Sequence, residues 1–185
     1  MAISKIGSTG IVNDSIGPNQ LDETANYTFT GTVAGAGGVM TPAFFAHSDG
    51  NQGGISDATW TKADLETEIF DSDNAFTSSK FTVPTGKGGK YCFFFKINSA
   101  GSTDYQKTGY SALYKNGSQL SNSGIYETVI FQESGVFNMD RIGIHGSIIL
   151  DLTAGDYIEL YGQADVNSGT VNFYHSFLGG YKIIE

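Results

Sequence analysis

Three histidines and two oxygen-rich loops are the residues best suited to metal or acid–base chemistry. His47, His145 and His175 lie far apart in the sequence and have no metal-ligand spacing such as His-Glu-x-x-His. Residues 47–51 and 71–74 carry the carboxylate and amide oxygens that calcium prefers, but the sequence pattern of a calcium-binding loop is absent. We therefore expect solvated turns here, with no metal ligand and no bound cofactor.

Nucleophilic and phosphate-binding patterns are also incomplete. Residues 86–90 form a glycine-rich run with two lysines, but no Lys-Ser or Lys-Thr pair opens a helix after it, so we interpret the run as a strand turn. Ser134 and Gly135 do not complete a nucleophile elbow, and the carboxylates form no paired-acid signature. The sequence predicts no catalytic residue, and we expect a protein that is not an enzyme.

The single cysteine, Cys92, lies in an apolar run. One cysteine can neither form a disulfide within the chain nor supply a four-ligand zinc site. Because free cysteine is among the most buried residue types, we expect Cys92 to be a small buried side chain.

Charge and hydropathy limit the partners of this chain. Ten basic against nineteen acidic residues give a formal net charge of -9, which disfavours nucleic acid because phosphate binding needs clustered Lys and Arg. No stretch reaches the ~20 apolar residues of a membrane helix, and residues 1–5 lack the apolar core of a signal peptide. We expect a soluble protein that is made inside a cell and does not insert into a membrane.

An extended arm precedes the domain that would position these side chains. The 185 residues suffice for one compact domain, residues 41–185, with residues 1–40 as the appended arm. The arm is rich in Gly, Thr, Asn and Ser, and residues 27–33 alternate large apolar side chains with threonine, a strand pattern that needs a neighbouring element or another chain to pair with. The arm residues that we expect to contact a binding partner are Ile11, Tyr27, Phe29 and Val33.

Short strands separated by turns fill the sequence from residue 42 onward. The 25 Gly, 13 Phe and 10 Tyr favour strands over helices, and only residues 62–69 leave a helix open. Asn116 and Gly117 predict a hairpin with a type I′ turn. Further strands are expected near residues 42–46, 81–83, 90–97, 126–131, 141–152, 157–161, 171–174 and 177–184. Eight to ten strands predict an all-β sandwich or barrel.

Aromatic residues exceed what the core of a small sandwich requires. In the strand at residues 90–97, side chains 91, 93, 95 and 97 share one face, which we expect to be the core face. Phe94 then points to the opposite face, where either a subunit contact or another part of the same chain must cover it. The side chains expected in core or subunit contacts are Phe44, Tyr91, Phe93, Phe94, Phe95, Tyr157 and Phe177.

Three motifs carry a family resemblance: Gly-x-Tyr-x-Phe-x-Phe at 89–95, Lys-Asn-Gly at 115–117 and Leu-x-Leu-x-x-Gly-Asp at 150–156. Together with Pro42-Ala43-Phe44 and Phe177-Leu178-Gly179, their order resembles that of the complement-type globular heads, which belong with tumour necrosis factor in a jelly-roll superfamily. The resemblance covers about residues 42–185. It implies a jelly-roll sandwich of about ten strands that forms a compact homotrimer, and related heads sometimes bind calcium.

The arm resembles the N-terminal portions of tailed-bacteriophage structural proteins, especially at residues 1–11 and 25–33. No collagen-like Gly-X-Y repeat or secretory signal precedes the domain. Together, the two resemblances imply a virion surface protein, made in the bacterial host cytoplasm, whose arm binds the major capsid protein or another virion protein. An extended chain spans at most ~3.3 Å per residue, so 40 residues suit attachment to a surface a few nanometres away. A tail fibre generally needs a longer shaft to reach a cell, and we therefore favour capsid decoration.

A host-binding module is the alternative function. A receptor- or glycan-binding fibre tip would use exposed loop aromatics, and the loops at residues 49–60 and 105–110 supply Trp60 and Tyr105 as stacking platforms. A core position for Trp60 fits the sequence equally well.

Overall fold

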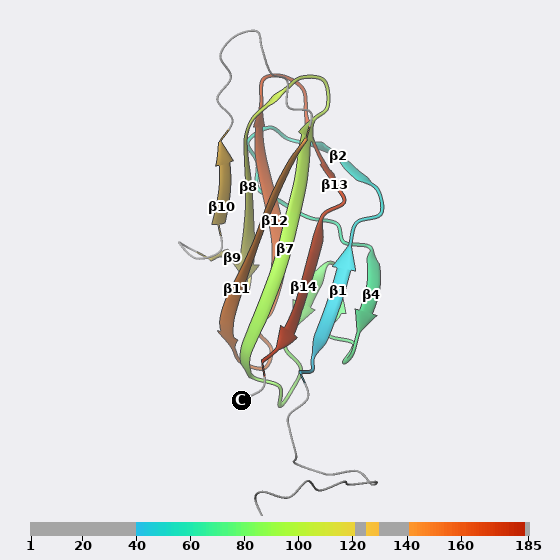
Figure 1. The fold of residues 1–185 in the computed structure, drawn as a ribbon, viewed down its shortest axis with the longest axis vertical. Coiled ribbons are helices and arrows are strands. Elements are labelled where there is room, and N and C mark those ends of the chain that lie inside the picture. The colour runs from blue at the N-terminus through green and yellow to red at the C-terminus, as the bar shows by residue number, and fades with distance from the viewer. Residues whose placement is uncertain (1–39, 121–124, 130–140, 184–185) are drawn as a thin grey trace, which may run out of the picture. The chain divides into compact units, whose positions relative to one another are not determined.

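The structure, a computed structural model, describes residues 40–120, 125–129 and 141–183. The chain divides into two units, residues 1–36 and 37–185, and every described residue belongs to the second. The predicted arm, with Ile11, Tyr27, Phe29 and Val33, therefore lies outside the described residues except at its end, Met40. The described residues form strands and no helix (Figure 1).

Sheet A has seven strands, all paired antiparallel. β13 and β14 pair with successive parts of one side of β7, and β11 pairs with the other side. The strands of sheet A are β2 (Asn51–Ile55), β13 (Val171–Tyr174), β7 (Gly89–Gly101), β14 (Phe177–Lys182), β1 (Ala43–His47), β4 (Thr67–Asp71) and β11 (Ile142–Leu152).

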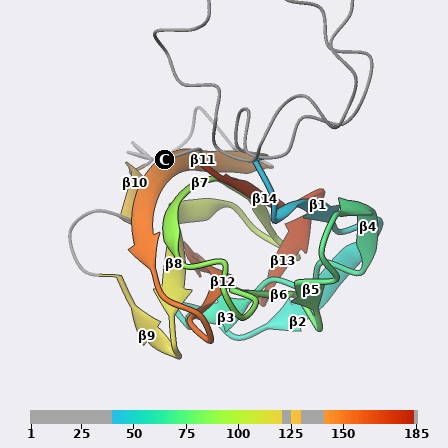
Figure 2. The ribbon, with the colours of Figure 1, turned by 90° about the horizontal axis from the view of Figure 1, so that it is seen from below.

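Sheet B also has seven strands, built around the long pair β8 and β12. Its strands are β10 (Ile125–Val129), β8 (Gln106–Lys115), β12 (Tyr157–Val166), β6 (Lys80–Thr82), β5 (Phe76–Thr77), β3 (Thr61–Lys62) and β9 (Ser118–Gln119). Seen from below, the two sheets curve around a common interior, and β10 of sheet B lies beside β11 of sheet A (Figure 2).

The path of the chain between the sheets is that of a jelly roll. β7 in sheet A is followed by β8 and β10 in sheet B, β11 in sheet A, β12 in sheet B, and β13 and β14 in sheet A. The all-β sandwich predicted from the sequence is thus confirmed. Residues 62–69, the one segment whose sequence is compatible with a helix, instead hold the last residue of β3 and the start of β4. The described residues hold fourteen strand segments rather than about ten, because β3, β5, β6 and β9 are additional segments of two or three residues.

The core between the sheets is largely aromatic. Phe44 stacks on Phe81 with ring centroids 4.7 Å apart, and Phe81 meets Phe93 edge-on at 5.7 Å. Side chains 91, 93, 95 and 97 of β7 are at most 1% exposed, which confirms the predicted core face. Burial, with Asp73 nearby, raises the pKa of the Tyr91 hydroxyl to about 12. Offset and edge-on aromatic pairs stabilise a core beyond the apolar area that they bury.

The sandwich has two ends, which we call the base and the apex. β7 spans about 40 Å from one to the other, at ~3.3 Å per residue. The chain enters β1 at the base, where the backbone N of Lys182 in β14 donates to the carbonyl O of Pro42 at 2.9 Å. The turn that joins β7 to β8 lies at the opposite end, the apex (Figure 1).

Two of the sequence motifs meet at the base. The side chain of Asp156 accepts hydrogen bonds from Asn116 Nδ2 at 2.7 Å and from the backbone N of Thr153 at 2.8 Å, and it pairs with Lys115 at 2.9 Å. These partners hold the pKa of the Asp156 carboxyl far below its ordinary value, the Thr153 backbone hydrogen bond first. Asn116 Oδ1 accepts from the backbone N of Tyr157 in return, at 2.9 Å. The Leu-x-Leu-x-x-Gly-Asp corner and the Lys-Asn-Gly hairpin are therefore one hydrogen-bonded junction.

The hairpin in this junction has the predicted turn. Asn116 and Gly117 both have positive φ angles, 53° and 77°, as a type I′ turn requires, and β9 pairs back onto β8. The corner carries the chain from β11 in sheet A to β12 in sheet B. Its glycine, Gly155, has a φ of 89°, and its N donates to the carbonyl O of Val83 at 2.9 Å.

Candidate interaction surfaces

A row of phenylalanines crosses the outer face of sheet A. The strand registers align Phe94 of β7, Gly179 of β14, Phe45 of β1 and Phe70 of β4 side by side, and we call these four residues the aromatic row. Because Phe93 and Phe95 point into the core, Phe94 points away from sheet B. The second sheet of the same chain therefore does not cover Phe94. Phe94 instead packs against Phe45 and Phe177, with ring centroids 6.0 and 6.4 Å away.

Gly179 makes this packing possible. A Cβ atom at Gly179 would come within 2.9 Å of Phe45 Cδ2 and closer still to Phe94 Cζ. Real Cβ atoms do not approach other atoms so closely, so any larger residue would displace the two rings. The glycine thus lets the rings of β7 and β1 lie over the strand between them.

The exposed apolar side chains gather on the same sheet. The large hydrophobic residues most exposed in the described part of the chain are Met40, Ile69, Phe70 and Ile149, at 50–60% exposure. Ile69 and Phe70 belong to β4, Ile149 to β11, and Met40 shortly precedes β1. Beside Phe94, a shallow hollow of about 360 Å³ opens between β7, β11 and β14. Large apolar patches of this kind mark interaction sites.

Cys92 lies on this outer face and not in the core. It is half-buried, in register with Ile149 on one side and Tyr181 on the other. A hydrogen bond with Cys92 raises the pKa of the Tyr181 hydroxyl. The prediction that Cys92 is a small buried side chain was wrong, because the strand alternation that buries Tyr91 and Phe93 turns residue 92 outward.

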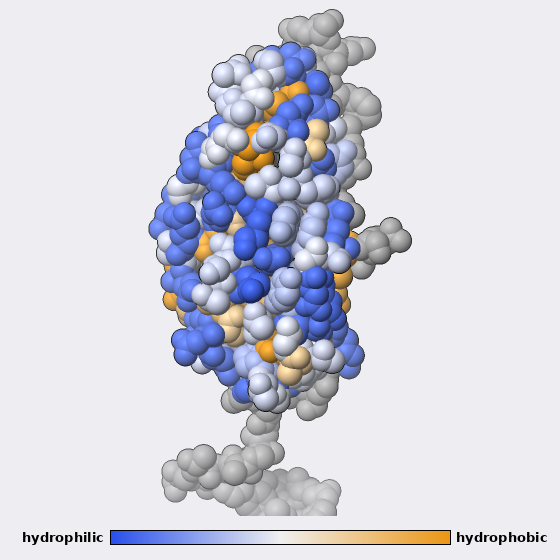
Figure 3. Space-filling view, turned by 180° about the vertical axis from the view of Figure 1, so that it is seen from behind, coloured by the Kyte–Doolittle hydropathy of each residue, from blue (hydrophilic) through white to orange (hydrophobic). Residues whose placement is uncertain are grey.

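The outer face of sheet B carries tyrosines and charges instead. Trp60 lies against Tyr110 and Tyr114, with ring centroids 6.1 and 6.3 Å apart, and Tyr114 stacks on Tyr161 at 3.8 Å. Burial raises the pKa of Tyr114 and of Tyr161. Seen from behind, this side of the molecule is mainly hydrophilic, with scattered hydrophobic residues (Figure 3). Trp60 is half-buried within this group, so the core position that the sequence left open is not the one observed.

Charged side chains complete the outer face of sheet B. Lys62 pairs with Glu159 at 3.1 Å and Lys107 with Asp165 at 3.2 Å. The ammonium group of Lys80 lies 4.8 Å from the ring centroid of Tyr157, one of the residues predicted for core or subunit contacts. Tyr157 therefore differs from Phe94 and Phe177, which lie on the outer face of sheet A, and from Phe44, Tyr91, Phe93 and Phe95, which lie in the core.

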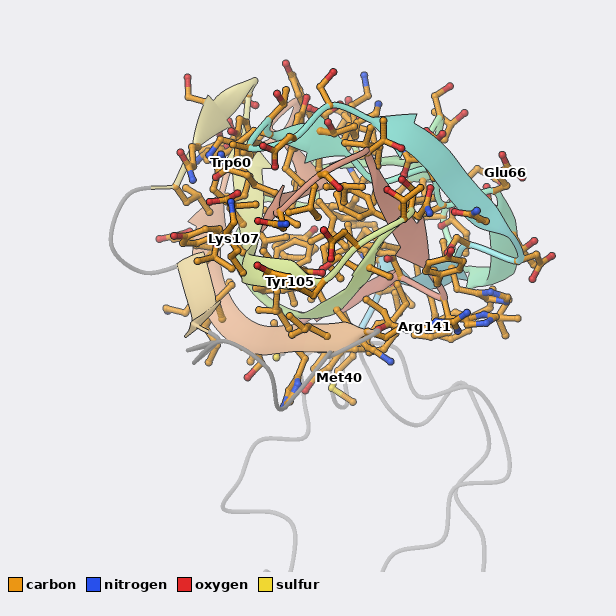
Figure 4. All side chains as sticks on the ribbon, turned by 90° about the horizontal axis from the view of Figure 1, so that it is seen from above. Met40, Trp60, Glu66, Tyr105, Lys107 and Arg141 are labelled. Carbon is orange, nitrogen blue, oxygen red and sulfur yellow. The ribbon has the colours of Figure 1, made fainter. Side chains whose placement is uncertain are left out.

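The two aromatic residues predicted for a host-contact loop lie in different places. Tyr105 lies at the apex, directly before β8, and lines a pocket together with Arg141 and Tyr174. Trp60 lies on the other side of the sandwich from Arg141 (Figure 4). Sequence reasoning missed Arg141. Its signal was present, because Arg141 is the only arginine among the ten basic residues.

The residues considered for metal chemistry are engaged in loop contacts. Asp71 accepts hydrogen bonds from the backbone N of Phe76 and of Asp73, at 2.7 and 3.3 Å, and Asp73 pairs with Lys87 at 3.5 Å. Asp49 lies 3.3 Å from the ring of His47. Within residues 40–120 and 141–183, no three His, Cys, Asp or Glu side chains are placed to hold a metal ion. The same residues include no helix of the length and apolar character that would span a bilayer.

Comparison with known proteins identifies the fold. The sequence matches no protein-family model and no curated protein. Murine APRIL at pH 8.0 is similar with a TM-score of 0.53 and 11% identity, over 76% of this chain and 98% of that one. The Eiger TNF of S. frugiperda gives a TM-score of 0.51 and 16% identity, over 77% and 93%. The globular domain of zebrafish complement 1qA protein gives 0.48 and 16%, over 77% and 97%.

These similarities agree with the strand order described above. The domain has the jelly-roll fold of tumour necrosis factor-like proteins, as the sequence motifs predicted. At 11–16% identity the similarity is one of fold alone.

Proposed function

We propose that the chain is a non-enzymatic structural protein of a bacteriophage virion: a homotrimeric jelly-roll knob that residues 1–40 fasten to the capsid surface. The arm binds the major capsid protein or another virion protein, so the knob decorates the particle. The resemblance of the arm to phage structural proteins supports the location, and the fold supports the knob. The protein is made in the host cytoplasm and functions on the virion surface, with no cofactor.

The outer face of sheet A is the observation that carries the proposal. Phe94, Phe45 and Phe70 stand in one row beside a hollow of about 360 Å³, with Ile149 exposed nearby. Covering such a surface stabilises an assembly by about 25 cal/mol per Å² of apolar area. A second copy of the chain is the occupant that we propose, because complement-type and tumour necrosis factor-like heads are trimers.

The direction of the chain supports attachment at the base. The polypeptide enters β1 from Met40 at the base, about 40 Å from the apex at ~3.3 Å per residue of β7. A partner bound by residues preceding Met40 would therefore hold the knob by its base, with the apical loops at the far end.

Two measurements on the same preparations test the proposal. Sedimentation equilibrium of the whole protein at micromolar concentration is expected to give the mass of three chains. The variant that lacks residues 1–40 is expected to remain trimeric but to lose binding to empty capsids in a co-sedimentation assay. A monomeric whole protein would refute the trimer, and a truncated knob that still decorates capsids normally would refute the role of the arm.

A glycan-binding fibre tip is the second candidate function, favoured by the position of Trp60. A half-buried tryptophan that packs against Tyr110 and Tyr114, with its ring tilted to both, supplies an aromatic surface of the kind that binds sugar rings. A glycan array probed with the whole protein would detect this function. Specific binding that Trp60→Ala abolishes supports it, and the absence of any sugar signal leaves decoration as the function.

A further inference from the structure

The apex contains a polar pocket of about 410 Å³. Its walls are the last two residues of β7 and the turn that follows, residues 100–105, together with Arg141 directly before β11 and Tyr174 at the end of β13. Figure 4 shows this end of the sandwich from above, with Tyr105 and Arg141 labelled. The volume lies in the usual range of ligand pockets, roughly 300–1,000 Å³.

Hydrogen bonds hold the walls of the pocket in place. Asp104 accepts from Asn167 Nδ2 at 2.8 Å, from Ser168 Oγ at 3.3 Å and from the backbone N of Tyr105 at 2.8 Å. These bonds lower the pKa of the Asp104 carboxyl, the one with Asn167 most. The Asp104 carboxylate therefore fixes the position of the loop at residues 167–170 relative to the turn after β7.

Ser102 fastens the same turn a second time. Its backbone N donates to the carbonyl O of Thr170 at 2.8 Å, and its Oγ accepts from the backbone N of Thr170 at 2.9 Å. Two independent sets of bonds thus join residues 100–105 to the neighbouring loop. This wall of the pocket is therefore in place before a ligand arrives, which reduces the entropy lost on binding.

Arg141 supplies the positive charge of the pocket. The guanidinium carbon of Arg141 lies 4.2 Å from the ring centroid of Tyr174, within the range of a cation–π contact. Four lysines, Lys62, Lys87, Lys107 and Lys115, pair with carboxylates, whereas no carboxylate of the described residues forms an ion pair with Arg141. The only arginine of a chain with net charge -9 thus lies against an aromatic ring, and among the residues that the structure describes no carboxylate pairs with it.

The chemistry of the walls indicates the class of ligand. A guanidinium presents its N–H groups in a planar fork that matches carboxylate or sulfate, and a cation–π contact with the Tyr174 ring does not use up those donors. Ser102 and Thr103 add hydroxyl groups, and Tyr105 adds a second aromatic ring. One cation beside Asp104 suits a singly charged anionic group better than a polyphosphate.

We propose that the apical pocket binds a negatively charged sugar, with Arg141 on its carboxylate or sulfate and the tyrosines beside its ring. Calorimetric titration of the whole protein tests this, with D-glucuronate and D-glucose 6-sulfate as probes and with D-glucose and acetate as controls. At least one anionic sugar is expected to bind about tenfold more tightly than either control, because a hydrogen bond between two charged groups is stronger than one between neutral groups.

Two variants of equal charge locate the site. Arg141→Gln is expected to weaken binding of the anionic sugar at least about tenfold, because it removes the charged fork from the pocket. Lys107→Gln is the matched control: it removes one positive charge from the same end of the sandwich, where Lys107 pairs with Asp165 and does not line the pocket. Its affinity is expected to stay within about twofold, because the long-range effect of one exposed charge is screened by salt.

Each other result would overturn the proposal. Acetate that binds as tightly as the anionic sugars would show a simple anion site, and glucose that binds as tightly would remove the role of charge. Equal losses in both variants would show a general effect of net charge, and no saturable heat with either probe would show no site. Tyr174→Leu is a second test that does not alter charge. It removes the aromatic ring against which Arg141 lies and is expected to weaken binding of the anionic sugar several-fold. The outcome is independent of the arm-deletion test, which does not involve the pocket.

Discussion

The outer faces of the two sheets differ in chemistry although the same fold builds both. Sheet A presents the aromatic row, with Ile149 and Phe70 at 60% and 50% exposure. Sheet B presents tyrosines, Trp60 and the ion pair between Lys62 and Glu159. Hydroxyl groups and charges remain compatible with water, whereas phenylalanine and isoleucine gain by being covered.

This difference suggests which side of the sandwich forms the contacts of the proposed trimer. Both sheets supply one apolar face to the common core, so the core does not distinguish them. An antiparallel sheet with one buried face is expected to be polar on the other, and sheet B follows that expectation while sheet A does not. The exposed Phe70 and Ile149 on sheet A would gain from a second covering surface, and in the proposed trimer a further copy of the chain would supply it.

The largest effect is expected from a charge on the assembling face. Phe94→Asp would place an unpaired carboxylate in the subunit contact, which costs about 3–5 kcal/mol and weakens association by at least about a hundredfold. Tyr110→Asp is the matched control on sheet B, because it makes the same change at a half-buried aromatic residue. Sedimentation equilibrium should show monomers for the first variant and trimers for the second. Trimers in both, or monomers in both, would contradict the assignment of the faces.

A substitution at the base should separate stability from assembly. Asp156→Asn removes the ion pair with Lys115 and weakens the junction with Asn116, for a loss of about 2–3 kcal/mol of unfolding free energy at pH 7. The junction joins the strands of both sheets away from the aromatic row, so the trimer should persist. Denaturant unfolding measures the first effect and sedimentation the second. A stable but monomeric variant would contradict this division.

The same variant should change the response to acid. Because the folded pKa of Asp156 lies below its unfolded value of ~3.9, its contribution is complete well above that value and falls as pH decreases from about 5. The difference in stability between the wild type and Asp156→Asn should therefore shrink from pH 7 to pH 3. Unfolding curves at both pH values measure it, and a difference that grows at low pH would contradict the sign.

A smaller effect is expected at the glycine of the aromatic row. Gly179→Ala forces the rings of Phe94 and Phe45 to move and should cost about 1–2 kcal/mol, with weaker association. Gly143→Ala is the control on the same face, where the added Cβ would meet only the flexible side chain of Lys96 at 3.3 Å. Thermal unfolding and sedimentation should both distinguish the two variants, and equal behaviour would show that Gly179 has no special role.

The smallest effect is expected on the solvent-facing sheet. Glu159→Gln breaks the ion pair between Glu159, whose side chain is 11% exposed, and Lys62, whose side chain is 32% exposed. The loss of unfolding free energy should be at most about 1 kcal/mol. Trimer mass should not change. A variant that dissociates would show that sheet B also contributes to the assembly.

Local patterns predicted much of the fold. The two-residue alternation in β7 identified the core face formed by Tyr91, Phe93 and Phe95, and Asn116-Gly117 identified the hairpin turn. Both features depend on residues that are neighbours in the sequence, so their physical cause is visible there. Two of the jelly-roll motifs were visible as short patterns, but the junction that they form at Asp156 joins residues about 40 positions apart and could not be predicted from either motif.

Features that depend on distant residues could not be predicted in the same way. The aromatic row combines β7, β14, β1 and β4, and its existence depends on registers that no single strand reveals. Cys92 was misplaced because the prediction rested on how often free cysteine is buried and not on the strand alternation, which turns residue 92 outward. Arg141 and Tyr174 are brought together because β11 and β13 both pair with the apical end of β7, so the apical pocket had no local signal beyond a solitary arginine.

The first and last strands of the domain, β1 and β14, are partners, joined at the base by the bond from Lys182 to Pro42. A peptide or label joined at either end of the domain would consequently be carried at the base and leave the apical loops unobstructed. Several copies held on one support in this orientation would face the same way. Weak individual contacts at the apex would then act together, and avidity would let millimolar sites give durable adhesion.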